Sequence, residues 1–388
     1  MTMASQSIED TPAGKEEALL SPPVPPEKAP RLMSLDVLRG FDMFWIVGGK
    51  EVFSALVALL CLSGGVPDWL EYHLNHPAWT GFSAWDLIMP LFLFVSGASI
   101  PFALALKAGE RRDYAAVYRR LIRRVVLLWI FGMIAQGNLL EMDPDRLRFF
   151  SNTLQAIAVG YAITVVAFIH TSLRWQVVLC AGLLATYWLL MMFVPVPGAG
   201  RWALEPDCNL ALWLDDLILG RFRDGTTYAW ILPGLGFGAS VLLGSFAGRM
   251  LRAPWTPRRR VAALAVSGAA CLFAGWLWGL HFPIIKHLWT SSMVLWAGGW
   301  SFLLLAFFYL VVDIADWKRW AYPFMVIGAN AITAYMLVHI IDFEALLKNL
   351  AFLKGGSEGV LMIAAALAFL LLWLFLWFLY KRKIFLRV

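Results

Sequence analysis

Eight long stretches of this chain contain no Asp, Glu, Lys or Arg, and they limit the possible folds more than any other feature. They cover residues 87–106, 149–173, 175–200, 225–248, 261–285, 287–312, 320–341 and 359–380. About 20 apolar residues in a helix cross the roughly 30 Å hydrocarbon core of a bilayer. Two further apolar segments, 35–62 and 125–140, are shorter or interrupted by charge. The pattern predicts an all-α polytopic integral membrane protein with about ten transmembrane helices.

Composition excludes several classes of protein. Hydrophobic residues make up 60% of the chain and charged residues 15%, whereas soluble proteins have about 45–50% and about 25%. The partner that this composition implies is a lipid bilayer, and the net charge of +6 does not indicate nucleic acid. Residues 1–30 lack an apolar core and are rich in Pro, Glu and Ser, so they are predicted to be a disordered tail rather than a signal peptide.

The distribution of basic residues predicts an orientation. With ten spans in order, 22 Lys and Arg fall on the side of the N-terminus and 8 on the opposite side, while Arg39 and Lys50 lie within the first helical segment. By the positive-inside rule, both termini are then cytoplasmic. The loops at 66–81, 194–228, 281–289 and 342–359 are expected to face outward.

The four cysteines do not predict a metal site. Cys61, Cys180, Cys208 and Cys271 show no CxxC spacing and no cluster with histidine, so no bound metal is expected. Cys61 and Cys208 are both predicted near the outer face, and whether they form a disulfide is left open.

Three ionisable residues lie in the cytoplasmic half of the first helix, in the segment SLDVLRGFDMFW. Asp36, Arg39 and Asp42 are spaced at i, i+3 and i+6, so Arg39 is able to pair with either carboxylate. Two interpretations follow: an interfacial salt bridge that sets the depth of the helix, or a site for a charged group arriving from the cytosol.

The outer half contains a possible acid–base pair. The segment EYHLNHPAWTGFSAWD carries His76 and Asp86 at or inside the start of the second helix. A histidine accepts and returns protons near neutral pH, and a neighbouring carboxylate orients its ring. His76 is therefore a candidate catalytic base with Asp86 as its orienting group, and the alternative is a solvated loop histidine.

Several other polar residues are expected near the same depth in different helices. Each alone would suit a helix-to-helix hydrogen bond, whereas together they indicate a polar cavity. They are His339 and Asn330 in GANAITAYMLVHIID, Lys286, Trp289 and Ser291 in KHLWTSS, and Gln155 in SNTLQAIAVGY.

The absence of common motifs narrows the chemistry further. The chain has no P-loop, no GxGxxG, no HExxH and no GxSxG motif, so use of ATP is not expected. The hydrophobic segments also show no matching pair of interrupted helices of the kind found in many secondary transporters.

Five motifs, in this order, resemble the heparan-α-glucosaminide N-acetyltransferase family and its bacterial relatives. They are RLMSLDVLRGFDMFWIVGG, HPAWTGFSAWDLIMPLFLFVSGASI, KHLWTSS, GANAITAYMLVH and YKRKIFLRV. The resemblance runs from about Arg31 to Val388 and implies that residues 31–388 form a transmembrane acyltransferase domain. It further implies a bacterial inner-membrane location, and a homodimer is the default expectation.

The resemblance implies an acetyltransferase. The family takes acetyl-CoA from the cytosol and acetylates the amino group of a terminal glucosamine on the other side of the membrane. The family's active-site histidine matches His76, its late-helix histidine matches His339, and the Asp of its second helix matches Asp86. This sequence has Trp79-Thr80-Gly81 where the family commonly has Trp-Asn-Gly, and Tyr228-Ala229-Trp230-Ile231 where it has a DPEG-like motif. Both departures are predicted to lie on the outer side, where the acceptor would bind, so they concern the identity of the acceptor.

The expected reaction transfers acetyl from the thioester to an amine or hydroxyl of a sugar. In this reaction His76 acts either as the base or as the carrier of the acetyl group. The expected catalytic residues are His76, Asp86 and His339. The expected substrate-binding residues are Lys286, Trp289, Ser291, Asn330, Gln155 and Trp79. Asp36, Arg39 and Asp42 are the candidate contacts for acetyl-CoA. Two rival hypotheses are an amino-sugar transporter without acyl-transfer chemistry and a purely structural helix bundle.

Overall fold

The structure is a computed structural model that describes residues 32–60, 67–105, 112–198, 200–341 and 358–386. The predicted tail at 1–30 and Cys61 lie outside these ranges. Cys208, Cys180 and Cys271 are free thiols.

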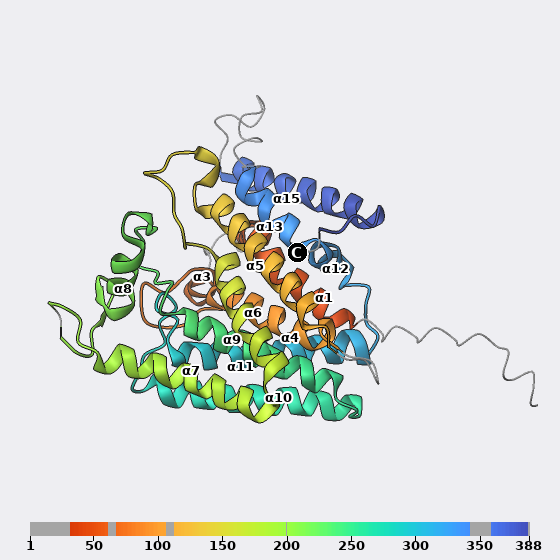
Figure 1. The fold of residues 1–388 in the computed structure, drawn as a ribbon. Helices are drawn as coiled ribbons and strands as arrows, with labels where there is room; N and C mark the ends of the chain where they lie inside the picture. The colour runs from red at the N-terminus through yellow and green to blue at the C-terminus, as the bar shows by residue number, and fades with distance from the viewer. Residues whose placement is uncertain (1–31, 61–66, 106–111, 199, 342–357, 387–388) are drawn as a thin grey trace, which may run out of the picture. The chain divides into compact units, whose positions relative to one another are not determined.

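The described residues are almost entirely helical, which confirms the all-α prediction (Figure 1). A single two-stranded antiparallel sheet, β1 (Leu204–Glu205) with β2 (Cys208–Asn209), is the one exception in the ranges given above. The main helices in chain order are α1 (Met33–Phe44), α2 (Lys50–Leu60), α3 (Asp68–Leu74), α4 (Ile88–Ala103), α5 (Tyr114–Gln136), α6 (Thr153–His170), α7 (Leu173–Phe193), α8 (Leu210–Leu219), α9 (Gly234–Arg252), α10 (Pro257–Gly279), α11 (Ser291–Phe308), α12 (Tyr322–Ala329), α13 (Ala331–Ile340) and α15 (Glu358–Lys381). Short 3₁₀ or π segments are η2 (Trp45–Gly49), η3 (Ala84–Leu87), η4 (Leu139–Glu141), η5 (Gly220–Phe222) and η6 (Tyr309–Ile314).

Fewer helices qualify as membrane spans than the sequence predicted. In the described part of the chain, seven helices are long and apolar enough to cross a membrane, and the count reaches eight if the bent pair α12–α13 is one span. The predicted ten included two segments that do not qualify. The first is broken at η2 into helices of 12 and 11 residues. The other is α5, whose first half carries Arg119, Arg120, Arg123 and Arg124.

Two of the predicted spans are interrupted, contrary to the expectation of unbroken helices. Val47 and Gly48 leave the helical conformation within η2, and Gly48 has φ +121°, a backbone region that favours glycine. The α12 and α13 helices meet at Asn330 with a bend of 75°. Local hydropathy does not report the break at Asn330, because the charge-free run 320–341 continues through it.

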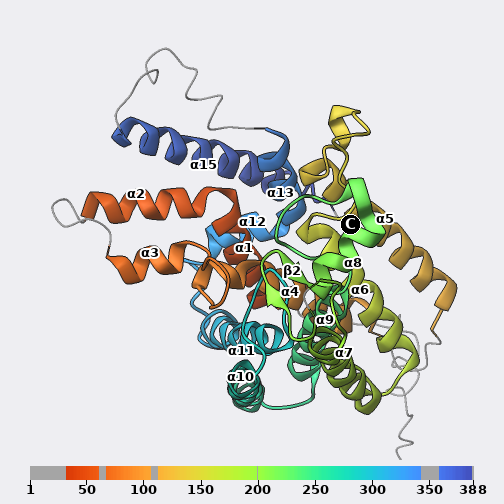
Figure 2. The ribbon, with the colours of Figure 1, turned by 90° about the vertical axis from the view of Figure 1, so that its left-hand side faces the viewer.

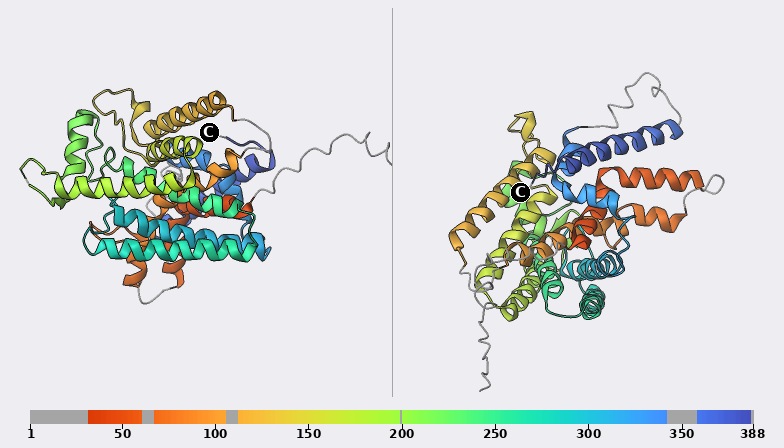
Figure 3. Two further views of the ribbon diagram at one scale, coloured as in Figure 1. Left: turned by 60° about the horizontal axis from the view of Figure 1, so that its bottom comes forward. Right: turned by 90° about the vertical axis from the view of Figure 1, so that its right-hand side faces the viewer.

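Close backbone contacts fix α4, the helix that follows the His76 loop. A Cβ on Gly97 of α4 would lie 1.9 Å from the carbonyl oxygen of Val241, and one on Gly244 of α9 would lie 1.9 Å from that of Phe94. Small residues allow membrane helices to approach this closely. The neighbouring pair α10 and α11 is also extensively packed, as the two views of Figure 3 show.

The loops predicted to face outward meet at one end of the bundle. Trp79 Nε1 donates to the carbonyl oxygen of Leu204 at 2.9 Å, and Gly81 N donates to that of Ile284 at 2.9 Å. Phe149 N donates to the carbonyl oxygen of Phe222 at 3.0 Å. Figure 2 shows α3, β2 and α8 in this region. Which side of the membrane these loops face stays a prediction, and residues 342–357 of the fourth predicted outward loop lie outside the described residues.

Candidate active site

The 3₁₀ turn η3, directly before α4, holds the carboxylate of Asp86 in place. Ser83 precedes η3 and forms a reciprocal capping box with Asp86: Ser83 N donates to Asp86 Oδ2 at 3.0 Å, and the side chains are 3.4 Å apart. Gly81, with φ +123°, supplies the turn that leads into this cap. The carboxylate is buried, with 1% of its side chain exposed.

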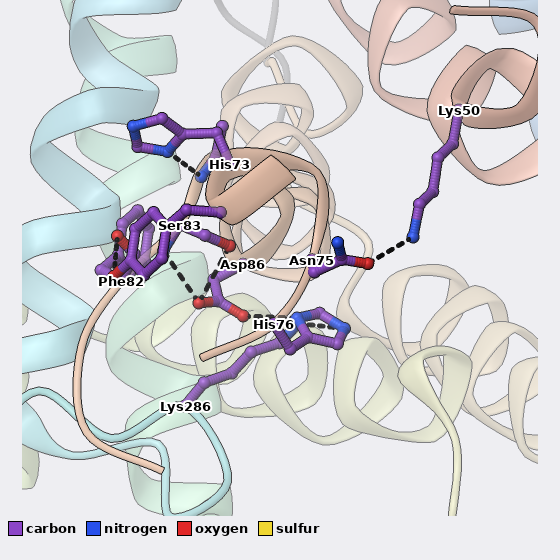
Figure 4. Close-up of polar contacts among 10 residues, drawn as sticks. Lys50, His73, Asn75, His76, Phe82, Ser83, Asp86 and Lys286 are labelled. Atoms are coloured by element: carbon purple, nitrogen blue, oxygen red, sulfur yellow. Dashed lines mark hydrogen bonds and ion pairs between the residues drawn. The ribbon is translucent and has the colours of Figure 1, made fainter. Parts of the chain in front are cut away.

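His76 contacts this carboxylate directly (Figure 4). Its Nδ1 atom lies 2.6 Å from Asp86 Oδ1, and 38% of the side chain is exposed. Because an ionised carboxylate only accepts hydrogen bonds, Nδ1 carries the proton, and in the neutral ring the lone pair is then on Nε2. His73, three residues earlier, accepts a hydrogen bond from Ala84 N at 3.3 Å instead.

Lys286 completes the group from a distant part of the sequence. Its Nζ atom lies 3.4 Å from Asp86 Oδ1 and 3.3 and 3.5 Å from the two ring nitrogens of His76. The isolated bridge between Thr80 and Ile285 ties the His76 loop to the segment that carries Lys286. Burial lowers the pKa of Lys286 to about 8, and the neighbouring carboxylate of Asp86 partly opposes this shift.

A cavity of about 630 Å³ opens beside this cluster. Its wall combines aromatic rings with polar side chains, a lining typical of sites for small polar molecules. The described lining residues are Ile46, His76, Trp85, Ile88, Met89, Gln136, Asn138, Arg148, Ser151, Thr153, Asp224, Thr226, Tyr228, Trp230, Lys286, Tyr335 and His339.

The Tyr228 side of the wall is held by hydrogen bonds and ring contacts. Asp215 accepts from Trp230 N at 2.7 Å and from Ile231 N at 3.0 Å. Tyr228 stacks on His287 with ring centroids 4.0 Å apart, and Thr227 Oγ1 lies 2.7 Å from His287 Nδ1. Burial, reinforced by the charge of Lys286, lowers the pKa of His287 to about 4, so this imidazole is neutral at physiological pH.

His339 reaches the same cavity without contacting His76. Its Nδ1 atom lies 2.8 Å from the carbonyl oxygen of Tyr335, and the two rings stack with centroids 4.1 Å apart. The hydroxyl of Tyr335 accepts a hydrogen bond from Asn152 Nδ2 at 2.9 Å. Asp86 rather than His339 therefore orients the ring of His76.

Four predicted substrate-binding residues form structural contacts and do not line this cavity. Gln155 is fully buried, accepting from Ser151 N and donating to Phe149 O. Trp289 donates its indole N–H to Ser240 Oγ at 3.1 Å, Ser291 donates to Leu184 O at 2.7 Å, and Trp79 donates to Leu204 O. Each satisfies a buried polar group within the scaffold of the site.

Asn330 is occupied by the C-terminal segment. Its Nδ2 donates to Ile384 O at 3.1 Å, and its Oδ1 accepts from Leu386 N at 3.3 Å. It therefore ties the break between α12 and α13 to the C-terminal segment and does not line the cavity.

The charged residues of α1 lie apart from the His76 cluster. Arg39 pairs with Asp36 at 3.4 Å and donates to Ser99 Oγ at 2.9 Å. Asp42 faces a separate cavity, described below, with an apolar lining that does not suit the phosphates of acetyl-CoA.

Sequence reasoning did not single out eight polar residues of the cavity wall, namely Gln136, Asn138, Arg148, Ser151, Thr153, Asp224, Thr226 and Tyr335. All but Tyr335 lie at helix ends or in loops, where no periodic pattern marks the side that faces a cavity. In the ranges that the structure describes, no group of three or more His, Cys, Asp or Glu is arranged to hold a metal ion.

The sequence of this chain is similar to one protein family and to two curated acetyltransferases. Residues 31–199, less than half of the chain, match a family described as "Domain of unknown function (DUF5009)". Heparan-alpha-glucosaminide N-acetyltransferase from Mus musculus is 24% identical over 423 residues, covering 93% of this chain and 61% of the mouse protein. The protein of the same name from Homo sapiens is 24% identical over 424 residues, covering 92% of this chain and 60% of its own length.

The chain is a distant relative of these acetyltransferases. The match agrees with the family resemblance found from the motifs, and it includes the His76 segment because it extends over nearly the whole chain. The chain spans about three fifths of the length of these relatives. The similarity alone therefore does not assign their complete activity to this chain.

Proposed function

We propose that this protein is a membrane-embedded acetyltransferase that moves the acetyl group of acetyl-CoA to the amino group of a glucosamine-type sugar. One observation carries the proposal: Asp86 holds Nδ1 of His76, which leaves Nε2 as a base beside a cavity of about 630 Å³. The names of the two relatives support the reaction class.

His76 acts on the acceptor. Its Nε2 atom removes a proton from the amine as the amine nitrogen bonds to the thioester carbon, and Asp86 stabilises the resulting imidazolium. The tetrahedral intermediate then expels the CoA thiolate and leaves an amide. A single proton therefore passes from the amine to His76, and the thiolate takes up one proton, either from this imidazolium or from a second donor whose proton the imidazolium then replaces.

Lys286 is suited to be that donor. Its pKa of about 8 lies close to the ordinary thiol pKa of about 8.5, which allows a nearly balanced proton transfer. Its ammonium also places positive charge beside the developing oxyanion before the proton moves. After transfer, the proton on His76 returns to Lys286 or to solvent.

The two substrates enter from opposite sides in this proposal. Acetyl-CoA comes from the cytosolic side, with Arg39 as a contact for a phosphate, and the thioester reaches His76 through the bundle. The acceptor sugar approaches from the outer side, where Asn138, Thr226 and Asp224 offer hydrogen-bonding groups. The proposed location is a bacterial inner membrane with both termini in the cytoplasm.

The experiment measures acetyl transfer by purified protein in nanodiscs, with labelled acetyl-CoA and glucosamine. Wild type should form labelled N-acetylglucosamine, and His76→Ala should lose roughly 10³-fold or more in rate because it removes the base. His73→Gln is the matched control, since this exposed histidine contacts Ala84 instead of the cluster, and it should stay near wild type. Equal rates for His76→Ala and wild type would exclude the assignment.

The same assay separates direct transfer from an acetyl-histidine intermediate. Direct transfer requires both substrates on the protein at once and gives intersecting initial-rate lines. An acetylated His76 gives the parallel lines of ping-pong kinetics.

A second candidate function is amino-sugar transport. Interrupted helices beside a central cavity are common in secondary transporters, and Ile46, Tyr335 and His339, which lie in or near the two broken spans, line this cavity. Uptake of labelled glucosamine into proteoliposomes without acetyl-CoA, with no acetylated product when acetyl-CoA is added, would favour this alternative.

A further inference from the structure

A second cavity, of about 240 Å³, lies between α1, α3, α4 and α11. Its wall is almost entirely apolar and includes Phe41, Trp45, Trp85, Leu91 and Leu304. Trp85 and Ile88 separate it from the reaction cavity, because both residues line both cavities. His73 and Ala84, the exposed members of its lining, mark its mouth.

One carboxyl group faces this apolar space. Asp42 is 1% exposed and is the single acidic residue among the described residues of the lining. Its Oδ2 atom is buried without a hydrogen-bond partner. Arg39, one turn earlier, contacts Asp36 and Ser99. Buried polar groups are nearly always paired, and an ionisable group within a membrane helix is a functional candidate by default.

The shape and chemistry of the pocket restrict the ligand. An engineered cavity of about 150 Å³ holds benzene, and pockets for drug-sized molecules begin near about 300 Å³, so this one takes a molecule of intermediate size. Aromatic rings attract cations, and a carboxylate accepts N–H hydrogen bonds. Lys50 already places its ammonium 4.7 Å from the ring centroid of Trp85, which shows that this ring accepts a cation.

We propose that this pocket binds a small amphipathic amine. The N–H groups of its ammonium donate to Asp42, and its apolar body packs against Phe41, Trp45 and Trp85. The proposal goes beyond acetyl transfer and does not depend on it, because the Asp42 pocket is separate from the cavity of His76.

The test is equilibrium binding to wild-type protein in nanodiscs of phosphatidylcholine, a lipid without net charge. The probe is tritiated 2-phenylethylamine, and its uncharged counterpart is tritiated 2-phenylethanol, with empty nanodiscs as background. The amine should bind saturably and at least about tenfold more tightly than the alcohol, because only the amine brings a charge to the carboxylate.

Three variants test whether the amine binds in the Asp42 pocket. Asp42→Asn keeps the size of the side chain and should weaken amine binding at least about tenfold, because an amide cannot ionise to pair with the ammonium. Ala84→Phe narrows the mouth and should weaken both probes. His76→Ala, in the other cavity, should leave the amine affinity unchanged.

The proposal is overturned if the amine shows no saturable binding, if the alcohol binds as tightly, or if Asp42→Asn binds like wild type. Loss of amine binding in His76→Ala alone would place the amine in the reaction cavity and also overturn it. If a variant does not elute as folded protein in size-exclusion chromatography, the comparison of amine with alcohol on wild type decides.

Discussion

The Nδ1 atom of His76 lies 2.6 Å from Oδ1 of Asp86, and this contact determines which nitrogen of the ring is free to act as a base. The carboxylate is itself fixed by the capping box with Ser83 and by the ammonium of Lys286. The histidine is therefore held in a single tautomer before any substrate binds, which is the condition for efficient proton removal.

Asp86→Asn tests this relationship. The amide keeps the shape of the side chain, but its N–H₂ group no longer fixes the tautomer of His76 and it carries no charge to stabilise the imidazolium. We expect kcat/KM for acetyl transfer to fall by roughly 10³- to 10⁴-fold. The measurement is the initial rate with labelled acetyl-CoA, together with thermal unfolding to show that the variant is folded. An unchanged rate in a folded variant would mean that Asp86 is only a helix cap.

Lys286→Arg tests the proton donor through pH dependence. Because the pKa of Lys286 is about 8, its ammonium is present below pH 8 and lost above it, so the wild-type rate should decline above about pH 8. Arginine stays protonated in this range. The variant should lose this alkaline decline, while its maximal rate falls roughly 10²-fold because a guanidinium does not release a proton to the thiolate.

The measurement is a profile of kcat/KM for acetyl-CoA between pH 6 and pH 10, which reports the pKa values of the free protein, corrected for uncatalysed hydrolysis of acetyl-CoA. An alkaline decline that persists unchanged in Lys286→Arg contradicts the role of Lys286. The alkaline decline would then reflect the titration of another ionisable group.

The His76–Asp86 pair was predictable from sequence, whereas the identity of the other wall residues was not. Nine residues separate His76 from Asp86 in the sequence, so chain connectivity keeps the two side chains within reach of each other. Lys286 was predicted at the outer end of its helix, but its contact with Asp86 depends on the pairing of Thr80 with Ile285, a long-range contact that no local pattern encodes.

Helix rotation explains why other predicted residues do not line the cavity. A helix that is apolar all round gives no amphipathic signal to show which side faces a cavity. Gln155, Ser291 and Trp289 face neighbouring elements and satisfy backbone or side-chain groups there. The direction of these side chains around their helices was therefore not readable from the sequence.

Gly244→Val tests the packing that supports α4. A Cβ at this position meets the carbonyl oxygen of Phe94 at 1.9 Å, so the two helices must separate. We expect a loss of more than about 3 kcal/mol, which is large relative to the stability of a typical domain. The assay is thermal unfolding in detergent with size-exclusion chromatography.

Gly182→Ala in α7 is the matched control for this substitution. No atom lies within 4 Å of a Cβ at Gly182, and alanine is a better helix former than glycine by up to about 1 kcal/mol. The control should be as stable as wild type or slightly more stable. Similar unfolding temperatures for Gly244→Val and wild type would contradict the close α4–α9 contact.

Cysteine labelling tests the predicted orientation in the membrane. In a variant without native cysteines, Arg146→Cys should react with a membrane-impermeant maleimide added outside intact spheroplasts, because residue 146 is exposed and is one of the 8 basic residues that the predicted topology places opposite the N-terminus. Arg258→Cys, at the exposed start of α10, should react only after the membrane is opened, because five basic residues between 249 and 260 favour the cytoplasmic side. The opposite labelling pattern would mean that the protein has the inverse orientation in the membrane. The acceptor would then reach His76 from the cytosol.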